Sequence, residues 1–440
     1  MNPLTARQRS TGSLQPEISR LDFLDATRAF ALVLGIVFHA SLSFTPTFMG
    51  WAVQDISTSP LVAMFFTVSH SFRMETFFLL AGFFGHVMFH RRGTAEFVRS
   101  RAIRIGVPFV AGWFLLRPLL VSGWIMGSAS LRGDYHFWPG IRDGFESLKT
   151  LPAGIFTGSH LWFLYYLALI TAMTLVLRGV MKVSGSWYGA MARRIDGVVA
   201  WLANSRLSLP VLVIPTAVTL GFMRFWAVDT PDQTLRPNLP VLLLYGGFFL
   251  LGWMFGRQPG AITGFARLTP ERWILAGVGI AATILLGGIE QDPGHPHYAA
   301  AHVGFAVSYA VTMWSLVSLA IGVFKKLCSE SHAWVRYIAD SSYWLYLIHL
   351  PIVVWLQVAV AEIHLHWALK LAFISTITIA LALLSYDLFV RSTWIGWILN
   401  GRRRERAMTP FVLRTVRLPW RGKQLRPATA TCRPGRIVGF

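Results

Sequence analysis

An arginine and a histidine stand eleven residues apart in one strongly apolar stretch, TRAFALVLGIVFHASLSF at 27–44. In a helix, eleven residues turn through about 1100°, about 20° more than three full turns, so Arg28 and His39 lie on one face. They are separated by about 16 Å along the helix axis. A histidine at that depth can act as a general base or a nucleophile. Because ionisable groups inside a membrane mark functional sites, His39 is a candidate catalytic residue.

The second apolar stretch carries two further ionisable groups in SHSFRMETFFLLAGFF at 69–84. His70 and Arg73 are one helical turn apart and share a face. A charged arginine at that depth costs about 3 kcal/mol unless it is paired or hydrated, so the fold must supply an anion, a watery cavity or both. We expect catalytic roles for His70 and Arg73. A structural ion pair between Arg73 and a carboxylate on another helix is the alternative.

Two more candidates come from YLIHLPI at 346–352, and a third, Asp25, lies three residues before Arg28. His349 falls near the middle of its apolar stretch, on the same helix side as Tyr346. We take His349 as a candidate catalytic residue and Tyr346 as an orienting one, with a hydrogen-bonded structural cluster as the alternative. Asp25 precedes Arg28 by three residues, a spacing at which its carboxylate orients the guanidinium.

A pair of arginines follows the second apolar stretch, in HRRGTAEFVRSRAIRIGVP at 90–108. Arg101 and Arg104 are three residues apart and project on one side of a helix. Two guanidiniums held together clamp phosphate oxygens through forked, charge-assisted hydrogen bonds. The alternative is the general excess of basic residues in cytoplasmic loops. No metal site is expected, because the sequence has no His-Glu-x-x-His and its carboxylates are few and mostly in loops.

The elements that must position these residues are membrane helices. The chain of 440 residues is 54% hydrophobic and 14% charged, with a mean hydropathy of +0.52. Apolar runs of about 20 residues recur along it, the length that crosses a bilayer as a helix. The sequence therefore predicts an all-α, polytopic membrane protein of about ten transmembrane helices. The predicted spans are 28–46, 62–90, 102–126, 160–181, 208–228, 239–256, 273–289, 303–324, 337–361 and 367–390.

The net charge of +20 is mainly a topology signal. With the N-terminus inside, most of the 40 lysines and arginines fall in cytoplasmic segments, which predicts that both termini are cytoplasmic and that no nucleic acid is bound. The predicted domains are an N-terminal cytoplasmic segment (1–27), a ten-helix transmembrane domain (28–392) and a basic, disordered tail (393–440). The tail is expected to rest on anionic membrane lipid.

Four sequence blocks of the transmembrane domain resemble a known family. FLDATRAFALVLGIVFHASL, HSFRMETFFLLAGFF, SHLWFL and YLIHLPI, with the pair Arg101-x-x-Arg104, resemble the membrane acyltransferase-3 family. They are most like its branch of the glucans biosynthesis protein C type, which succinylates osmoregulated periplasmic glucans. The resemblance implies a multi-pass enzyme of the bacterial inner membrane that moves an acyl group from cytoplasmic acyl-CoA to a hydroxyl of a periplasmic glucan. It identifies His39 as the catalytic histidine and Arg28 as the residue completing its motif.

The residues fit this chemistry. Arg28, Arg101 and Arg104 would bind the phosphates of acyl-CoA, which is a co-substrate, so no permanently bound cofactor is expected. The pantetheine arm of acyl-CoA is long enough to bring the thioester from these arginines to His39. Arg73 would stabilise the oxyanion or bind the free carboxylate of a succinyl group. Two alternatives stay open: acetyl transfer to another cell-envelope carbohydrate, and a transporter of glucan or acyl groups that uses histidines as proton relays.

Overall fold

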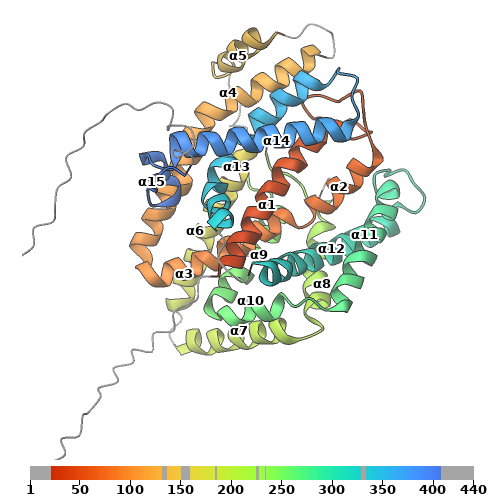
Figure 1. Ribbon diagram of the computed structural model, residues 1–440. Helices are drawn as coiled ribbons and strands as arrows, with labels where there is room; N and C mark the ends of the chain where they lie inside the picture. The colour runs from red at the N-terminus through yellow and green to blue at the C-terminus, as the bar shows by residue number, and fades with distance from the viewer. Residues whose placement is uncertain are drawn as a thin grey trace, which may run out of the picture.

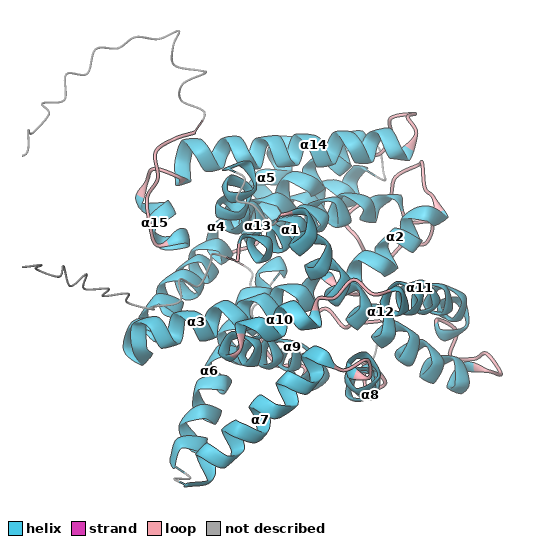
Figure 2. Ribbon diagram, turned by 60° about the horizontal axis from the view of Figure 1, so that its bottom comes forward, coloured by secondary structure: helices cyan, strands magenta, loops and turns pink. Residues whose placement is uncertain are grey.

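The computed structural model describes residues 21–130, 136–149, 159–183, 186–223, 227–232, 234–328 and 333–407. Within these ranges the regular structure is helical and contains no strand (Figure 2). The all-α prediction is therefore confirmed. Helix α1 (Asp22–Ser41) lies near the middle of the bundle and packs against α2, α3, α12, α13 and α14 (Figure 1). His39 is in its last turn.

The remaining long helices are α3 (Arg73–Arg101), α4 (Val107–Ser130), α6 (Trp162–Val183), α7 (Ser186–Asn204), α8 (Ser208–Leu220), α9 (Leu239–Arg257), α11 (Pro270–Glu290), α12 (Tyr298–Leu327), α13 (Ala333–Val360) and α14 (Trp367–Ser385). The shorter helices are α2 (Pro60–His70), α5 (Phe137–Glu146), α10 (Pro259–Phe265) and α15 (Trp394–Asn400). Two 3-10 turns, η1 (Leu42–Phe44) and η3 (Ser159–Leu161), and two π turns, η2 (Ala102–Gly106) and η4 (Tyr386–Val390), join or extend them.

In the described part of the chain, 8 helical runs are long and apolar enough to cross a membrane, or 9 if the pair 189–204 and 208–220, bent by 110°, counts as one span. The protein is thus a multi-pass membrane protein. One of the runs, Pro60–Ser130, has 71 residues, whereas a single crossing needs about 20. Gly93, at φ 77° and ψ 172°, breaks it. The count of ten spans and the cytoplasmic position of both termini stay predictions.

The predicted span 62–90 is interrupted, and this corrects the expectation that His70 and Arg73 share one helix face. α2 ends at His70 and α3 begins at Arg73, with Phe72 at φ −136° and ψ −13° between them. The Ser71 hydroxyl and its backbone N–H both donate to the Val68 carbonyl, at 2.8 and 3.3 Å. Such local bonds compete with the helical ladder, which is why this helix ends inside an apolar stretch. A broken helix is tolerated at membrane depth where protein surrounds it.

A buried ion pair holds the segment that follows α1. Lys370 Nζ lies 2.7 Å from Asp55 Oδ1, and each side chain is 1% exposed. Lys370 also donates to the Ala361 carbonyl, while the backbone N–H of Asp55 bonds to the Ser43 carbonyl. These contacts tie residues 45–59 to α14 and to the end of α1. Trp51, within this segment, is thereby held beside the last turn of α1.

The tail expected to be disordered from residue 393 onward begins with ordered structure. Residues 394–400 form α15, which ends at Gly401 with φ 70°. Arg402 and Arg404 each place a guanidinium nitrogen 3.1 Å from a carboxylate oxygen of Asp340 on α13. This pairing accounts for the order of residues 401–407. The rest of the predicted tail, 408–440, and most of the predicted N-terminal segment lie outside the described residues.

Helices α3 and α9 cross through two reciprocal glycines. A Cβ at Gly82 of α3 would overlap the Phe249 carbonyl of α9, and a Cβ at Gly252 of α9 would overlap the Leu79 carbonyl of α3. Small residues allow membrane helices to approach this closely, so that backbone packs on backbone. The crossing holds α3, and with it Arg73, in the bundle.

We expect Gly252→Ala to lower the free energy of unfolding by about 1–3 kcal/mol, because the added methyl group overpacks a backbone contact. The matched control is Gly247→Ala on the same helix, where a Cβ meets no atom within 4 Å. Alanine there should be neutral or stabilise by up to about 1 kcal/mol, since it is the better helix former. Unfolding is followed by tryptophan fluorescence in mixed micelles. Equal stability of the two variants would contradict the proposed crossing.

Candidate active site

His39 lies at a junction of aromatic side chains from three segments. Its ring centroid is 5.3 Å from that of His349 on α13 and 5.9 Å from that of Trp51, whose plane is within 16° of parallel. His39 keeps part of its surface accessible, and its Nδ1 is buried without a hydrogen-bond partner in the structure. An imidazole with an unused nitrogen is able to accept a proton or form a bond to an acyl carbon.

His349 is anchored to its own helix. Its Nδ1 lies 2.8 Å from the Tyr346 carbonyl and 3.1 Å from the Leu345 carbonyl. Carbonyl oxygens only accept, so Nδ1 carries the hydrogen and Nε2 of the neutral ring is left as an acceptor. His349 thus lies beside His39, while its catalytic role stays a prediction.

A third histidine, His160, was given no role by the sequence analysis and joins the same cluster. Its ring centroid is 6.0 Å from that of His349, and its Nε2–H donates to the Leu347 carbonyl at 2.9 Å. That carbonyl is free because Pro351, four residues later in α13, has no N–H to give it. Tyr346 donates its hydroxyl to the His160 carbonyl at 2.7 Å. The predicted orienting residue Tyr346 thus contacts His160 and holds the turn η3.

Arg73 and His70 both pack against the ring of Phe38. The Arg73 Cζ lies 4.1 Å from the centroid of Phe38, a cation–π contact, and the His70 ring stacks on Phe38 at 5.7 Å. His70 Nδ1 is 3.1 Å from the Tyr309 hydroxyl. Phe38 is adjacent to His39. The break between α2 and α3 therefore brings His70 and Arg73 close to the histidine cluster, which consists of His39, His160 and His349.

The Arg73 guanidinium is buried, at 6% exposure, and its Nη1 has no hydrogen-bond partner. Among the described residues it forms no ion pair, so the structural pair considered as an alternative is not found there. Glu75, two residues later, is fully buried, and both of its carboxylate oxygens lack a hydrogen bond. A desolvated cation with a free donor is a ready site for an anion.

Gln357 connects Trp51 to the helix that carries His39. The Trp51 indole N–H donates to Gln357 Oε1 at 2.9 Å, and Gln357 Nε2 donates to the carbonyls of His39 and Ala40 at 2.9 and 3.1 Å. Gln357 is 1% exposed, so these bonds face no competition from water. Sequence analysis missed both residues. A glutamine inside an apolar stretch was the available signal for Gln357, and no local signal marked Trp51.

The arginines of the predicted phosphate clamp lie at the other end of α1. Arg28 Nη2 is 3.2 Å from Asp25 Oδ1, as the three-residue spacing predicts, and donates to the Ala339 carbonyl at 3.1 Å. Its guanidinium is 6.0 Å from the Phe84 ring, while Arg101 reaches the Ala81 carbonyl, at 3.5 Å, on the preceding turn of α3. Arg28 and Arg101 therefore approach the same stretch of α3.

Arg101 and Arg104 are linked by a π turn, not by the regular α-helix that their spacing suggested. Arg101 ends α3, and Arg104 lies within η2, whose carbonyl at Arg104 accepts a hydrogen bond from the Tyr343 hydroxyl. The two guanidiniums stay close enough to repel each other. The Arg104 guanidinium packs against Gly401, the glycine that ends α15. The clamp expected from the sequence is thus partly covered by the beginning of the tail.

A comparison with protein families finds that the profile of a family described as an acyltransferase domain matches residues 21–387. The chain belongs to this acyltransferase-3 family. The match covers every candidate residue described above, so the enzyme is an acyltransferase that transfers a group other than an aminoacyl group. Among the described residues of the acyltransferase, no group of three or more His, Cys, Asp or Glu side chains could hold a metal ion.

Curated relatives of the acyltransferase include proteins named Glucans biosynthesis protein C from Salmonella agona, Salmonella paratyphi A and Salmonella typhi. Each is 24% identical over 386 residues, covering 86% of the acyltransferase and 94% of the relative. No solved structure matches the acyltransferase. The similarity therefore extends over nearly the whole of each relative.

We expect Gln357→Leu to reduce the rate of acyl transfer tenfold to a hundredfold, or about 1.4–2.7 kcal/mol, because Trp51 and the His39 turn lose their common support. The rate is measured with labelled acyl-CoA at equal amounts of folded protein. Gln258→Leu is the control, since that amide bonds to the Asp196 carbonyl at the distant end of α9. A rate within twofold of the unsubstituted enzyme would remove Gln357 from this role.

Proposed function

We propose that the acyltransferase moves a succinyl group from cytoplasmic succinyl-CoA to a hydroxyl of a periplasmic glucan, in the inner membrane of a bacterium. The observation that carries the proposal is the buried Arg73 guanidinium, with an unused Nη1, packed on Phe38 beside His39. The name of the relatives, Glucans biosynthesis protein C, associates them with glucan biosynthesis, which supports a glucan acceptor.

On the donor side, Arg28, Arg101 and Arg104 bind the phosphates of coenzyme A. Guanidiniums suit phosphate because each offers a planar fork of donors and a charge that does not titrate. Arg28 and His39 are about 16 Å apart along α1. The pantetheine arm spans this distance, so the thioester reaches the histidine cluster while the nucleotide stays at the arginines.

At the cluster, His39 removes the proton from the attacking hydroxyl as its oxygen bonds to the thioester carbonyl carbon. The tetrahedral intermediate expels the coenzyme A thiolate, which takes the proton from the imidazolium. The succinyl ester is left on the glucan. His349 and His160, each held by a backbone carbonyl, keep the surroundings of His39 fixed. An acyl group carried briefly by His39 is a second route to the same product.

Arg73 selects the donor. A succinyl group ends in a carboxylate, which pairs with the free donor of Arg73, whereas an acetyl group has no charge to offer. A desolvated cation is costly unless an anion arrives. A dicarboxylate donor therefore gives this arginine a partner during catalysis. If Arg73 contacts only the oxyanion, acetyl and succinyl donors are used alike, and the function becomes acetyl transfer to an envelope carbohydrate.

We expect His39→Ala to abolish label transfer from succinyl-CoA to a β-glucan in detergent, because the proton acceptor is lost. The exposed His364→Ala serves as the control and should retain full activity. Transfer is measured by glucan-bound label with succinyl-CoA or acetyl-CoA as donor. Activity of His39→Ala above a tenth of that of the unsubstituted enzyme would exclude His39 as the catalytic base.

We expect Arg73→Gln to lower kcat/KM for succinyl-CoA at least tenfold more than kcat/KM for acetyl-CoA, since only the succinyl group carries a carboxylate. Arg73→Lys, which keeps the charge, should recover part of the preference. Arg117→Gln removes another buried arginine, on α4, and should leave the ratio of the two donors unchanged. An equal loss for both donors would show that Arg73 does not recognise the carboxylate.

A further inference from the structure

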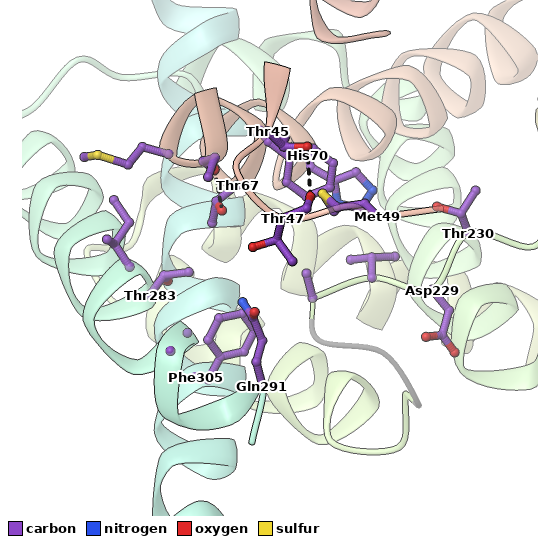
Figure 3. A pocket seen from close by; sticks show the side chains of 18 of the residues that line it. Thr45, Thr47, Met49, Thr67, His70, Asp229, Thr230, Thr283, Gln291 and Phe305 are labelled. Carbon is purple, nitrogen blue, oxygen red and sulfur yellow. Dashed lines mark hydrogen bonds between the residues drawn. The ribbon is translucent and has the colours of Figure 1, made fainter. Parts of the chain in front are cut away.

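A large cavity opens beside the histidine cluster, between α2, the segment after α1, the α8–α9 connection, and the ends of α11 and α12 (Figure 3). Its volume is about 1210 Å³, above the range of about 300–1,000 Å³ typical of small-molecule sites. The cavity therefore holds a ligand with several linked units more readily than a single small molecule.

The lining is rich in groups that both donate and accept hydrogen bonds. Side chains from separate segments face a common space in Figure 3, and hydroxyls are the most frequent polar group among them. The hydroxyl-bearing residues are Thr45, Thr47, Thr67, Thr230, Thr234 and Thr283. Two carboxyls, Asp229 and Asp232, and two amides, Asn238 and Gln291, complete the polar lining together with Arg236. Burial raises the pKa of Asp232 above its ordinary value, which disfavours its charged form.

The rest of the wall is apolar and includes four phenylalanine rings among aliphatic side chains, prolines and glycines. Phe48 and Phe222 are 56% and 74% exposed, and Phe66 and Phe305 also line the cavity. Such a mixture of flat apolar surface and hydroxyl or amide partners matches a sugar, which has an apolar ring face and a rim of hydroxyls that both donate and accept. A hydrocarbon chain would take the threonine hydroxyls, Asp232 and Gln291 out of water without offering them a hydrogen bond. Asp229 and Asn238 already bond to each other within the lining. A polyanion would meet two carboxyls and one arginine.

The cavity shares one residue, His70, with the candidate active site. His70 lines it and is stacked on Phe66 at 5.4 Å and on Phe38 at 5.7 Å. The Arg73 guanidinium packs on the ring of Phe38, which is adjacent to His39 in the sequence. His70 therefore stands between the cavity and the histidine cluster, at the position where a bound hydroxyl would approach.

We propose that this cavity binds a segment of several sugar units of a neutral glycan, the acceptor chain, and directs one of its hydroxyls past His70 to the histidine cluster. The inference rests on the proposed function, because it names where the acceptor of that same reaction binds. It assigns acceptor recognition to α2, to the segment 45–49 and to the outer part of α11, away from the arginines that serve the donor.

The test measures binding without the donor, so that no acyl transfer is required. The probe is a neutral β-glucan oligosaccharide, titrated into purified protein in a detergent that has no sugar headgroup, with calorimetry as the readout. Ala63→Trp on α2 and Gly288→Trp on α11 fill the cavity from exposed lining positions. Leu61→Trp and Leu285→Trp are the matched controls, exposed residues of the same helices that do not line the cavity.

We expect both cavity variants to raise the Kd for the oligosaccharide at least tenfold, and both controls to stay within twofold of the unsubstituted protein. Thermal unfolding of all four variants checks that each one is folded. An unchanged Kd in Ala63→Trp and Gly288→Trp, or no saturable binding by the unsubstituted protein, would overturn the proposal.

The outcomes separate this inference from the proposed function. Binding that the cavity variants abolish, without succinyl transfer by the unsubstituted enzyme, would support the cavity and refute the function. Succinyl transfer with an unchanged acceptor KM in both cavity variants would support the function and place acceptor binding elsewhere.

Discussion

The structure depends on one constraint, the cost of leaving an ionisable or polar group in hydrocarbon without a partner. Each buried cation meets this cost differently. Lys370 is paired with Asp55, both at 1% exposure, and this pair anchors the segment that carries Trp51. Arg73 packs on the face of Phe38 and forms no ion pair among the described residues. Because a buried pair satisfies itself whereas a lone cation requires an anion, the first contact is structural and the second suits a substrate.

Irregular backbone places the functional groups where regular helices would not. The break at Ser71 and Phe72 separates two helices whose ends, His70 and Arg73, both pack against Phe38. Pro351 frees the carbonyl that orients His160. The π turn η2 follows Arg101 and contains Arg104, whose carbonyl accepts a hydrogen bond from Tyr343. Each irregularity removes or redirects a main-chain hydrogen bond, and the freed group is used by a side chain or lies in the protein interior, as a membrane requires.

The proposed reaction is consistent with this arrangement because its two substrates approach from different ends of α1. The arginines proposed to bind phosphate lie near Ala81 and Phe84 of α3, whereas the cavity proposed to bind sugar units is lined by His70. The close crossing of α3 and α9, through Gly82 and Gly252, holds α3, which begins at Arg73 and ends at Arg101, in the bundle. The beginning of the tail, held by Asp340, packs on Arg104 and makes the donor end more basic than the loop arginines alone.

By itself, the sequence determined the helical class, the membrane location and the first candidate residues, because apolar length and helical spacing are local properties. Arg28 and Asp25 pair as their spacing requires. Only the tertiary structure decided that His160, Trp51 and Gln357 join His39. His160 and Gln357 come from segments far from His39 in the chain, and Trp51 comes from the irregular segment that follows α1. It also decided where the helix ends between His70 and Arg73 and that residues 394–407 are ordered. Such outcomes depend on long-range packing and on competing hydrogen bonds, which no local pattern encodes.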